Sequence, residues 1–87
     1  METLGKVREL KKKYSDSIIL IRVGMYYVSY NIDADICSKT LGINRIVDTD
    51  GATGERFISA SFPHHALDTY LPKLIRAGHR VAICDQL

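Results

Sequence analysis

The sequence of 87 residues has no tryptophan, two prolines, two cysteines and no long apolar run. No stretch approaches the roughly 20 apolar residues that a membrane-spanning helix needs, and the first residues lack the pattern of a signal peptide. Cys37 and Cys84 lie in apolar surroundings, which is more typical of buried thiols than of a disulfide framework. We therefore expect a cytoplasmic protein with one domain, spanning residues 1–87, and no membrane contact.

Motifs for catalysis and for cofactor binding are also missing. The glycine-rich loop at residues 48–54 does not have the spacing of a phosphate-binding loop. The candidate metal ligands are His64, His65, His79, Cys84 and Asp85. Adjacent histidines on a helix point about 100° apart, which makes them poor joint ligands; a Cys84–His79 nucleophile pair is open by spacing but has no orienting motif. We expect no metal, no cofactor and no enzymatic activity.

Basic residues gather at the start of the chain, although the net charge is only +2. The first thirteen residues carry five basic and two acidic side chains. A basic helix of this kind could lie along phosphates, and Lys11, Lys12 and Lys13 are its candidate contacts to a nucleic-acid backbone. The plainer alternative is a solvated helix face that lysines keep soluble.

Hydrophobic periodicity predicts an α/β fold of the α+β kind, a mixed β-sheet with about three flanking helices. The predicted helices cover residues 3–14, 31–41 and 62–77. The predicted strands cover residues 18–23, 25–30, 43–47, 56–61 and 80–84. The first strand is a continuous aliphatic run, which is typical of a strand covered on both faces, and the last one is also expected to be buried.

Four residues mark the expected ends and irregularities of the helices. Asn31 is a plausible N-cap of the second helix, and Gly42 is a suitable residue just after its end. Pro63 is expected at the first position of the third helix, where its missing N–H costs nothing. Pro72 lies inside the same helical pattern, so it should remove one hydrogen bond and bend the helix near residues 68–72.

The aromatic segment at residues 25–30 alternates with a period of two. One face carries Tyr26, Val28 and Tyr30, and the other carries Met25, Tyr27 and Ser29. Tyr26 on an outward face could act as a stacking surface or as a wedge between base steps, a device of minor-groove proteins. The alternative is a structural tyrosine whose hydroxyl is satisfied at the rim of the domain.

Three blocks of the sequence carry a family resemblance: residues 22–24 before the aromatic strand, residues 41–43, and the long block at residues 62–87. Together they resemble the N-terminal mismatch-recognition domain, domain I, of the MutS mismatch repair proteins. The resemblance covers nearly all of this chain but a small part of a MutS protein, whose connector, core, clamp and ATPase domains have no counterpart here. The family's domain also continues with at least one more strand, so we expect either a piece of a longer protein or a stand-alone relative.

The resemblance implies a site on the aromatic strand. In the family this strand reads Gly-Asp-Phe-Tyr-Glu; the phenylalanine wedges beside the mispaired base from the minor groove, and the glutamate hydrogen-bonds that base. Here Gly24 and Tyr27 match, Met25 replaces the aspartate, Tyr26 replaces the phenylalanine and Val28 replaces the glutamate. Tyr26 keeps a flat ring that can stack. Val28 cannot form a hydrogen bond, and losing a polar base contact removes about 1–3 kcal/mol of discrimination.

Two functions follow from these observations. The first is a non-catalytic DNA-binding module of mismatch repair with reduced or absent mismatch selectivity, whose partners are double-stranded DNA and other MutS domains, and whose location is then the nucleoid. The second is a protein-interaction or structural module that kept the fold, with Tyr26, Val28 and Tyr30 as an apolar contact patch. A basic rim around Tyr26 would favour DNA, and a neutral apolar rim would favour a protein partner. We expect the first.

Overall fold

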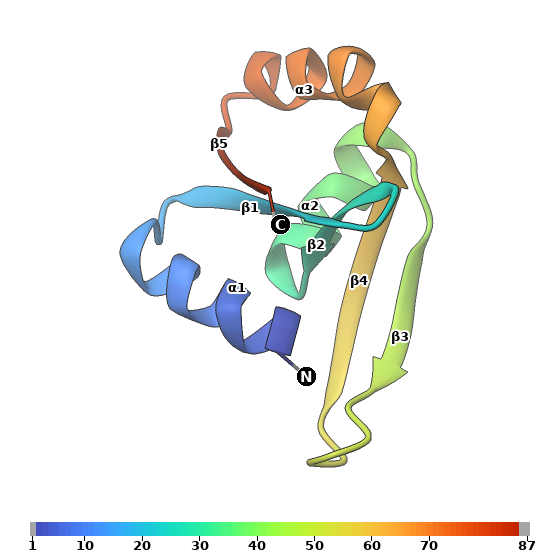
Figure 1. The fold of residues 1–87 in the computed structure, drawn as a ribbon. Helices are drawn as coiled ribbons and strands as arrows, with labels where there is room; N and C mark the ends of the chain where they lie inside the picture. Colours follow the sequence, from blue (N-terminus) through green and yellow to red (C-terminus); the bar gives the residue numbers. More distant parts are fainter. Residues whose placement is uncertain (1, 86–87) are drawn as a thin grey trace.

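The computed structural model describes residues 2–85, with the side chains of residues 4–85, and it contains one mixed sheet and three α-helices within that range. Along the chain the elements are α1 (Glu2–Lys13), β1 (Ser17–Val23), β2 (Tyr26–Tyr30), α2 (Ile32–Leu41), β3 (Arg45–Thr49), β4 (Arg56–Pro63), a 3-10 helix η1 (His64–Ala66), α3 (Leu67–Arg76) and β5 (Arg80–Asp85). The predicted α+β class is confirmed (Figure 1). None of the helices described is long and apolar enough to cross a membrane.

The sheet has the strand order β3-β4-β2-β1-β5. The pairs β1–β2, β2–β4 and β3–β4 are antiparallel, and β5 runs parallel to β1. The middle of β1 is fully buried because its alternate residues face opposite layers: Ile18 and Leu20 pack with α2 and α3, whereas Ile19 and Ile21 pack with α1. The prediction of a first strand covered on both faces is confirmed, and the aliphatic run explains it, since both faces need apolar side chains.

The third helix begins later than predicted. Phe62 and Pro63 belong to β4, where they lie opposite Tyr27 and Tyr26, and Pro63 has the extended backbone angles φ −59° and ψ 140°. The ring of Phe62 is buried in the core between β2 and α3, which holds the strand extended to this point. A short 3-10 turn follows before α3 starts at Leu67. Pro72 does lie inside α3, as predicted.

Asn31 occupies the N-cap position of α2, but its side chain does not cap the helix. Its backbone N–H donates to the Ile58 carbonyl at 2.7 Å, and its side-chain oxygen accepts from the Ile58 N–H at 3.3 Å. These bonds hold Asn31 against β4 with φ of +56°, a conformation that few residues other than glycine adopt. At the other end, Gly42 has φ of +71° and its N–H donates to the Ser38 carbonyl, so the predicted helix end is confirmed.

β5 is an edge strand and is only partly buried, so the predicted buried last strand is wrong. It pairs with β1 on one side, and within the described residues no strand pairs with its other side. Ile83 is 42% exposed, and Cys84 is only partly buried. Cys37 is buried as predicted, and its removal from water raises the pKa of the thiol.

A single buried carboxylate joins α1, β1 and α2. Asp33 is 2% exposed; one of its oxygens accepts from Lys11 Nζ at 2.8 Å and the other from the Ile19 N–H at 3.1 Å. Lys11 Nζ also donates to the Ser17 carbonyl at 2.6 Å. Since each partner lies on a different element, this carboxylate fixes how α1 crosses the sheet.

Replacing Asp33 with alanine should destabilise the fold markedly, because it leaves the Lys11 ammonium without its carboxylate partner and the buried Ile19 N–H without an acceptor. We expect the free energy of unfolding to fall by about 2–3 kcal/mol, measured by urea denaturation. Asp16→Ala is the matched control, since Asp16 pairs with Arg80 at the surface, and it should cost less than about 1 kcal/mol. Equal losses in the two variants would contradict the structural role of Asp33.

Candidate nucleic-acid interface

The candidate site is the turn between β1 and β2. Val23 lies directly opposite Tyr26, so the loop consists of Gly24 and Met25 alone. Gly24 has φ of +60° and Met25 has no positive φ, which is the pattern of a type II′ turn with glycine at its first central position. A two-residue turn of this type fixes the register of the strands, and it therefore fixes the position of Tyr26.

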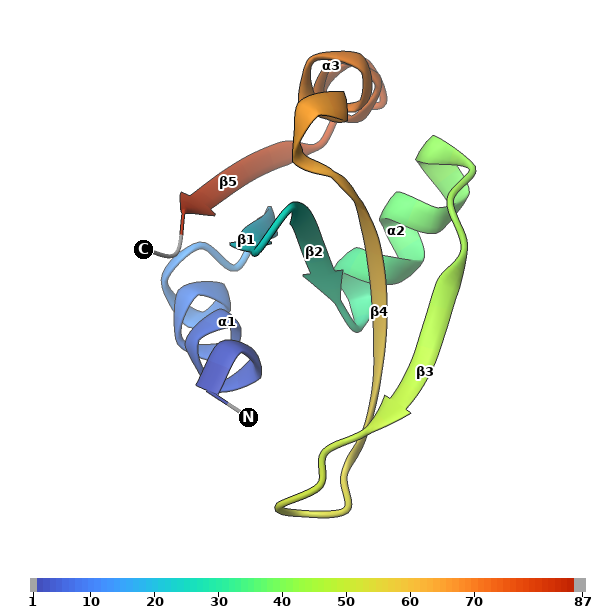
Figure 2. The same cartoon turned by 45° about the vertical axis from the view of Figure 1, so that its right-hand side comes forward.

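β2 is held from both sides at the same point. Tyr26 lies opposite Val23 on β1 and opposite Pro63 on β4, and the His64 N–H donates to the Met25 carbonyl at 2.8 Å. Figure 2 shows the turn beside the segment that leads from β4 into α3. The backbone around Tyr26 is therefore anchored by two neighbouring segments and does not form a free loop.

The side chains at this turn are apolar and exposed. Tyr26 is 50% exposed, Met25 63% and Val23 40%, and Pro63 beside them is exposed as well. We call these four residues the β1–β2 tip. Single exposed apolar side chains are common on protein surfaces, but several gathered in one place are typical of a contact surface.

Tyr27, next in sequence, points to the opposite face and is part of the core. It is 6% exposed, its ring centroid lies 6.0 Å from that of Phe62, and its hydroxyl donates to an Asp85 oxygen at 3.0 Å. Burial, followed by this hydrogen bond, raises the pKa of the Tyr27 hydroxyl. The alternation therefore separates the two tyrosines, with Tyr26 on the surface and Tyr27 in the core.

Val28 and Tyr30 share the face of Tyr26 but not its exposure. Val28 is half-buried and packs on the cluster that α1 covers. Tyr30 is 8% exposed, and its ring lies 5.9 Å from that of Phe57. The predicted apolar patch of Tyr26, Val28 and Tyr30 is therefore wrong as a surface, because α1 closes over its inner end.

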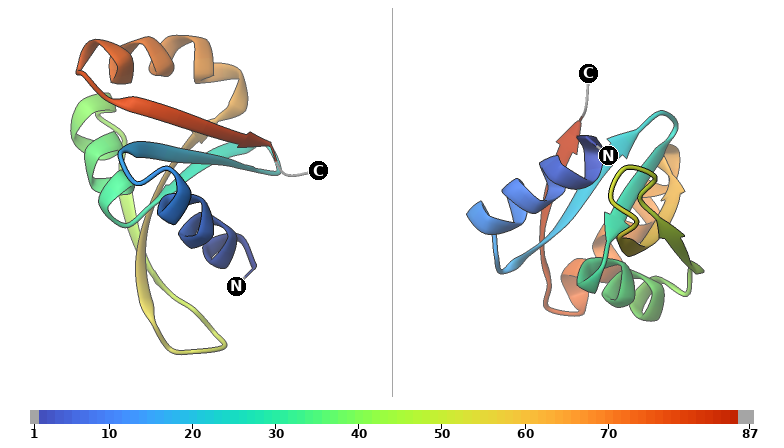
Figure 3. Two further views of the ribbon diagram at one scale, coloured as in Figure 1. Left: turned by 90° about the vertical axis from the view of Figure 1, so that its left-hand side faces the viewer. Right: turned by 90° about the horizontal axis from the view of Figure 1, so that it is seen from below.

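The predicted lysines do not lie near Tyr26. Lys11, Lys12 and Lys13 end α1 just before β1 begins, whereas Tyr26 lies beside the last residue of β1 (Figure 3). With a rise of about 3.3 Å per residue, the two ends of this strand are roughly 20 Å apart. Lys11 is also committed to Asp33.

One arginine and two histidines border the tip instead. Arg22 lies at the end of β1, where its Nε donates to the Gly24 carbonyl at 3.2 Å. His64 and His65 follow Pro63 in η1; His64 is half-buried and His65 is exposed. The predicted helix over residues 62–77 placed these histidines near a helix start. It did not place Pro63 beside Tyr26, because that contact depends on the extension of β4 to Pro63.

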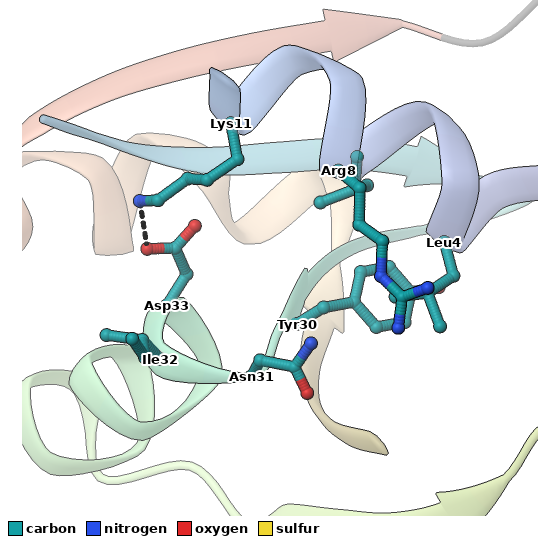
Figure 4. Close-up of a pocket in the computed structure, with 8 residues that line it drawn as sticks. Leu4, Arg8, Lys11, Tyr30, Asn31, Ile32 and Asp33 are labelled. Atoms are coloured by element: carbon teal, nitrogen blue, oxygen red, sulfur yellow. Dashed lines mark hydrogen bonds and ion pairs between the residues drawn. The ribbon is translucent and has the colours of Figure 1, made fainter. Parts of the chain in front are cut away.

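A small pocket lies away from the tip, between α1 and the start of α2 (Figure 4). It encloses about 110 Å³ and its walls are mainly apolar. Its cationic groups are paired, Lys11 with Asp33 and Arg8 with Glu55, and the latter pairing raises the pKa of Arg8. In residues 2–85 no group of three or more His, Cys, Asp or Glu side chains is placed to hold a metal ion. The tip is therefore the stronger candidate site.

Comparison with known proteins gives a consistent result. The sequence matches the family described as MutS domain I over residues 3–87. The DNA mismatch repair protein MutS of Bacteroides thetaiotaomicron is 54% identical over 79 residues, which are 91% of this chain and 9% of that protein. Its counterpart in Porphyromonas gingivalis is 54% identical over 80 residues, with the same two shares, and that of Flavobacterium psychrophilum is 51% identical over 84 residues, 97% of this chain and 10% of that protein. The chain thus spans about a tenth of the length of these relatives.

Removing a single hydroxyl should distinguish the two neighbouring tyrosines. Tyr27→Phe deletes the donor to Asp85 and should lower the free energy of unfolding by about 1 kcal/mol. Tyr26→Phe removes the same atom from an exposed ring and should change it by less than about 0.5 kcal/mol. Urea denaturation of both variants measures the difference. A larger loss for Tyr26→Phe would contradict the assignment of the two faces.

Proposed function

The chain belongs to the MutS domain I family, and from this we propose that it is a DNA-binding module of the mismatch-repair type, with residues 1–87 acting as one unit. Its proposed partners are double-stranded DNA, matched or mismatched, and the other domains of a MutS protein. The proposed role is binding only, because in MutS proteins the ATPase lies in another domain. The curated relatives named above carry the name of DNA mismatch repair proteins, which supports this role.

The exposed ring of Tyr26 on the braced turn is the observation that carries the proposal. A wedge must be flat, accessible and held by a backbone that does not yield, because partial unstacking of a base step costs a few kcal/mol. The ring is half-exposed, and hydrogen bonds of β1, β4 and η1 fix the backbone on both sides of it. Stacking on a base returns about 1–3 kcal/mol, so the ring can offset much of that cost.

Val28 supports the further proposal that mismatch selectivity is reduced or absent. Its side chain has no hydrogen-bonding atom, and it is half-buried against the cluster under α1. Ser61, opposite Val28 on β4, stands where the family usually has glycine, and it is exposed. A base beside Tyr26 would therefore meet a valine methyl where the family has a carboxylate.

A protein-interaction role is the second candidate, and the neutral tip favours it. Val23, Met25 and Tyr26 offer three exposed apolar side chains, and Lys11, Lys12 and Lys13 lie at the other end of β1. Such a surface would suit an apolar protein partner as well as a base stack. Direct binding to DNA distinguishes the two roles.

Replacing Tyr26 with alanine should weaken DNA binding about tenfold or more, since one stacking contact of about 1–3 kcal/mol is lost. Fluorescence anisotropy of a labelled duplex measures the affinity, with a matched duplex, a G·T mismatch and a one-base loop compared at two salt concentrations. The control is Lys39→Ala, because Lys39 lies on the exposed side of α2. This variant should bind the duplexes like the wild type. If the wild-type chain binds none of these duplexes at low salt, the proposed DNA binding by this chain is wrong and the protein-interaction role is favoured.

Restoring the family's carboxylate should increase mismatch preference. Val28→Glu is expected to increase the difference in binding free energy between mismatched and matched duplex by about 1–3 kcal/mol, the value of one polar base contact. Val23→Glu places the same charge opposite Tyr26 and should weaken binding to both duplexes alike. Far-ultraviolet circular dichroism checks that both variants fold, because Val28 is half-buried. If folded Val28→Glu protein showed the same mismatch preference as the wild type, the proposal that residue 28 contacts the base would be contradicted.

A further inference from the structure

We infer that His64 and His65 supply the phosphate contacts beside the Tyr26 wedge, so that DNA binding strengthens as these imidazoles gain protons. The inference rests on the proposed function and goes beyond it, because it names the backbone contacts and makes them depend on pH. It replaces Lys11, Lys12 and Lys13, which lie at the far end of β1 from Tyr26.

The geometry places both histidines at the tip. Pro63 is the ladder partner of Tyr26, and His64 follows it directly with its N–H bonded to the Met25 carbonyl at 2.8 Å. The two imidazole centroids lie 5.9 Å apart. The minor groove of B-DNA is about 6 Å wide, so a ring that enters it from this turn brings the adjacent η1 residues to the phosphates that line the groove.

Few acidic side chains of the chain lie near the turn, so a polyanion can approach it. Residues 17–30, which form β1, β2 and their turn, contain no acidic side chain. In residues 59–84 the single acidic side chain is Asp68, which is exposed near the start of α3, the helix packed on η1. Asp85 on β5 accepts the Tyr27 hydroxyl, and Arg22 on β1 adds a permanent positive charge. A phosphate at the turn would thus meet Arg22 and two imidazoles, with Asp68 and Asp85, the ladder partner of Arg22, as the opposing groups.

Histidine makes this contact conditional. Its side chain is the one that ordinarily changes charge between pH 5 and 8. Protonation of both imidazoles adds two positive charges beside the groove and none elsewhere at the tip. Each added phosphate contact should release about 0.9 counterion from B-DNA, and this number can be measured from the salt dependence of binding.

The test is the slope of log affinity against log salt concentration, measured for the whole chain and a short duplex at pH 5.5 and at pH 8.0. For the wild type we expect the slope to be steeper at pH 5.5 by about 1–2, corresponding to one or two added phosphate contacts. The double variant His64→Asn with His65→Asn should show the same slope at both pH values. His65→Lys should steepen the slope at pH 8.0 relative to the wild type, because the lysine charge is permanent, and should leave only the contribution of His64 dependent on pH.

His79 provides the matched control, since it is the third and last histidine of the chain. It precedes Arg80, which pairs with Ser17 at the end of β1 remote from Tyr26. His79→Asn should keep the full pH dependence. A pH dependence that survives in the double variant, or that is lost in His79→Asn, would overturn the inference while leaving the Tyr26 result intact. Absence of any duplex binding would overturn the proposed function and this inference together.

Discussion

The double pairing of β2 is the constraint on which the site depends. β2 lies between β1 and β4, and the same residue, Tyr26, is opposite Val23 on one side and Pro63 on the other. A shift of either ladder by one residue would exchange Tyr26 with Tyr27 and would move a core ring to the surface. The short turn at Gly24 and the extension of β4 to Pro63 prevent that shift.

The layers around β2 explain why one aromatic strand serves two purposes. On one face, Tyr27 joins Phe62 and Tyr70 in a chain of ring contacts under α3. On the other, α1 covers Tyr30 but does not reach the turn, so the face changes along its length from core to surface. The position of α1 in turn depends on the bond between Lys11 and Asp33. Lys11, which the sequence suggests for phosphate binding, is therefore occupied by the buried Asp33 and is not part of the candidate interface.

The amino-acid sequence predicted the parts that local patterns control. The aliphatic run of β1, the alternation of β2 and the end of α2 at Gly42 each follow from periodicity or from a single residue with special backbone freedom. The remaining features depend on contacts between distant segments. Pro63 is compatible with a helix start, and only its place opposite Tyr26 makes it a strand residue. The run of β5 is as apolar as a central strand, and its position at the edge is a property of the whole sheet. For the site, the opposite faces of Tyr26 and Tyr27 follow from the alternation. The exposure of Tyr26, in contrast to the burial of Tyr30 on the same face, depends on where α1 packs.

The chain has the fold of MutS domain I, with Tyr26 and Val28 on β2, and we propose that the Tyr26 ring enters the base stack. The most direct measurement is the fluorescence of a 2-aminopurine placed next to a mismatch in a duplex, because this base brightens when it is unstacked. The account predicts that wild-type protein raises the fluorescence at saturation and that Tyr26→Ala, at concentrations where it also saturates the duplex, does not. Equal brightening by both proteins, or none by the wild type when it is fully bound, would contradict insertion of the ring.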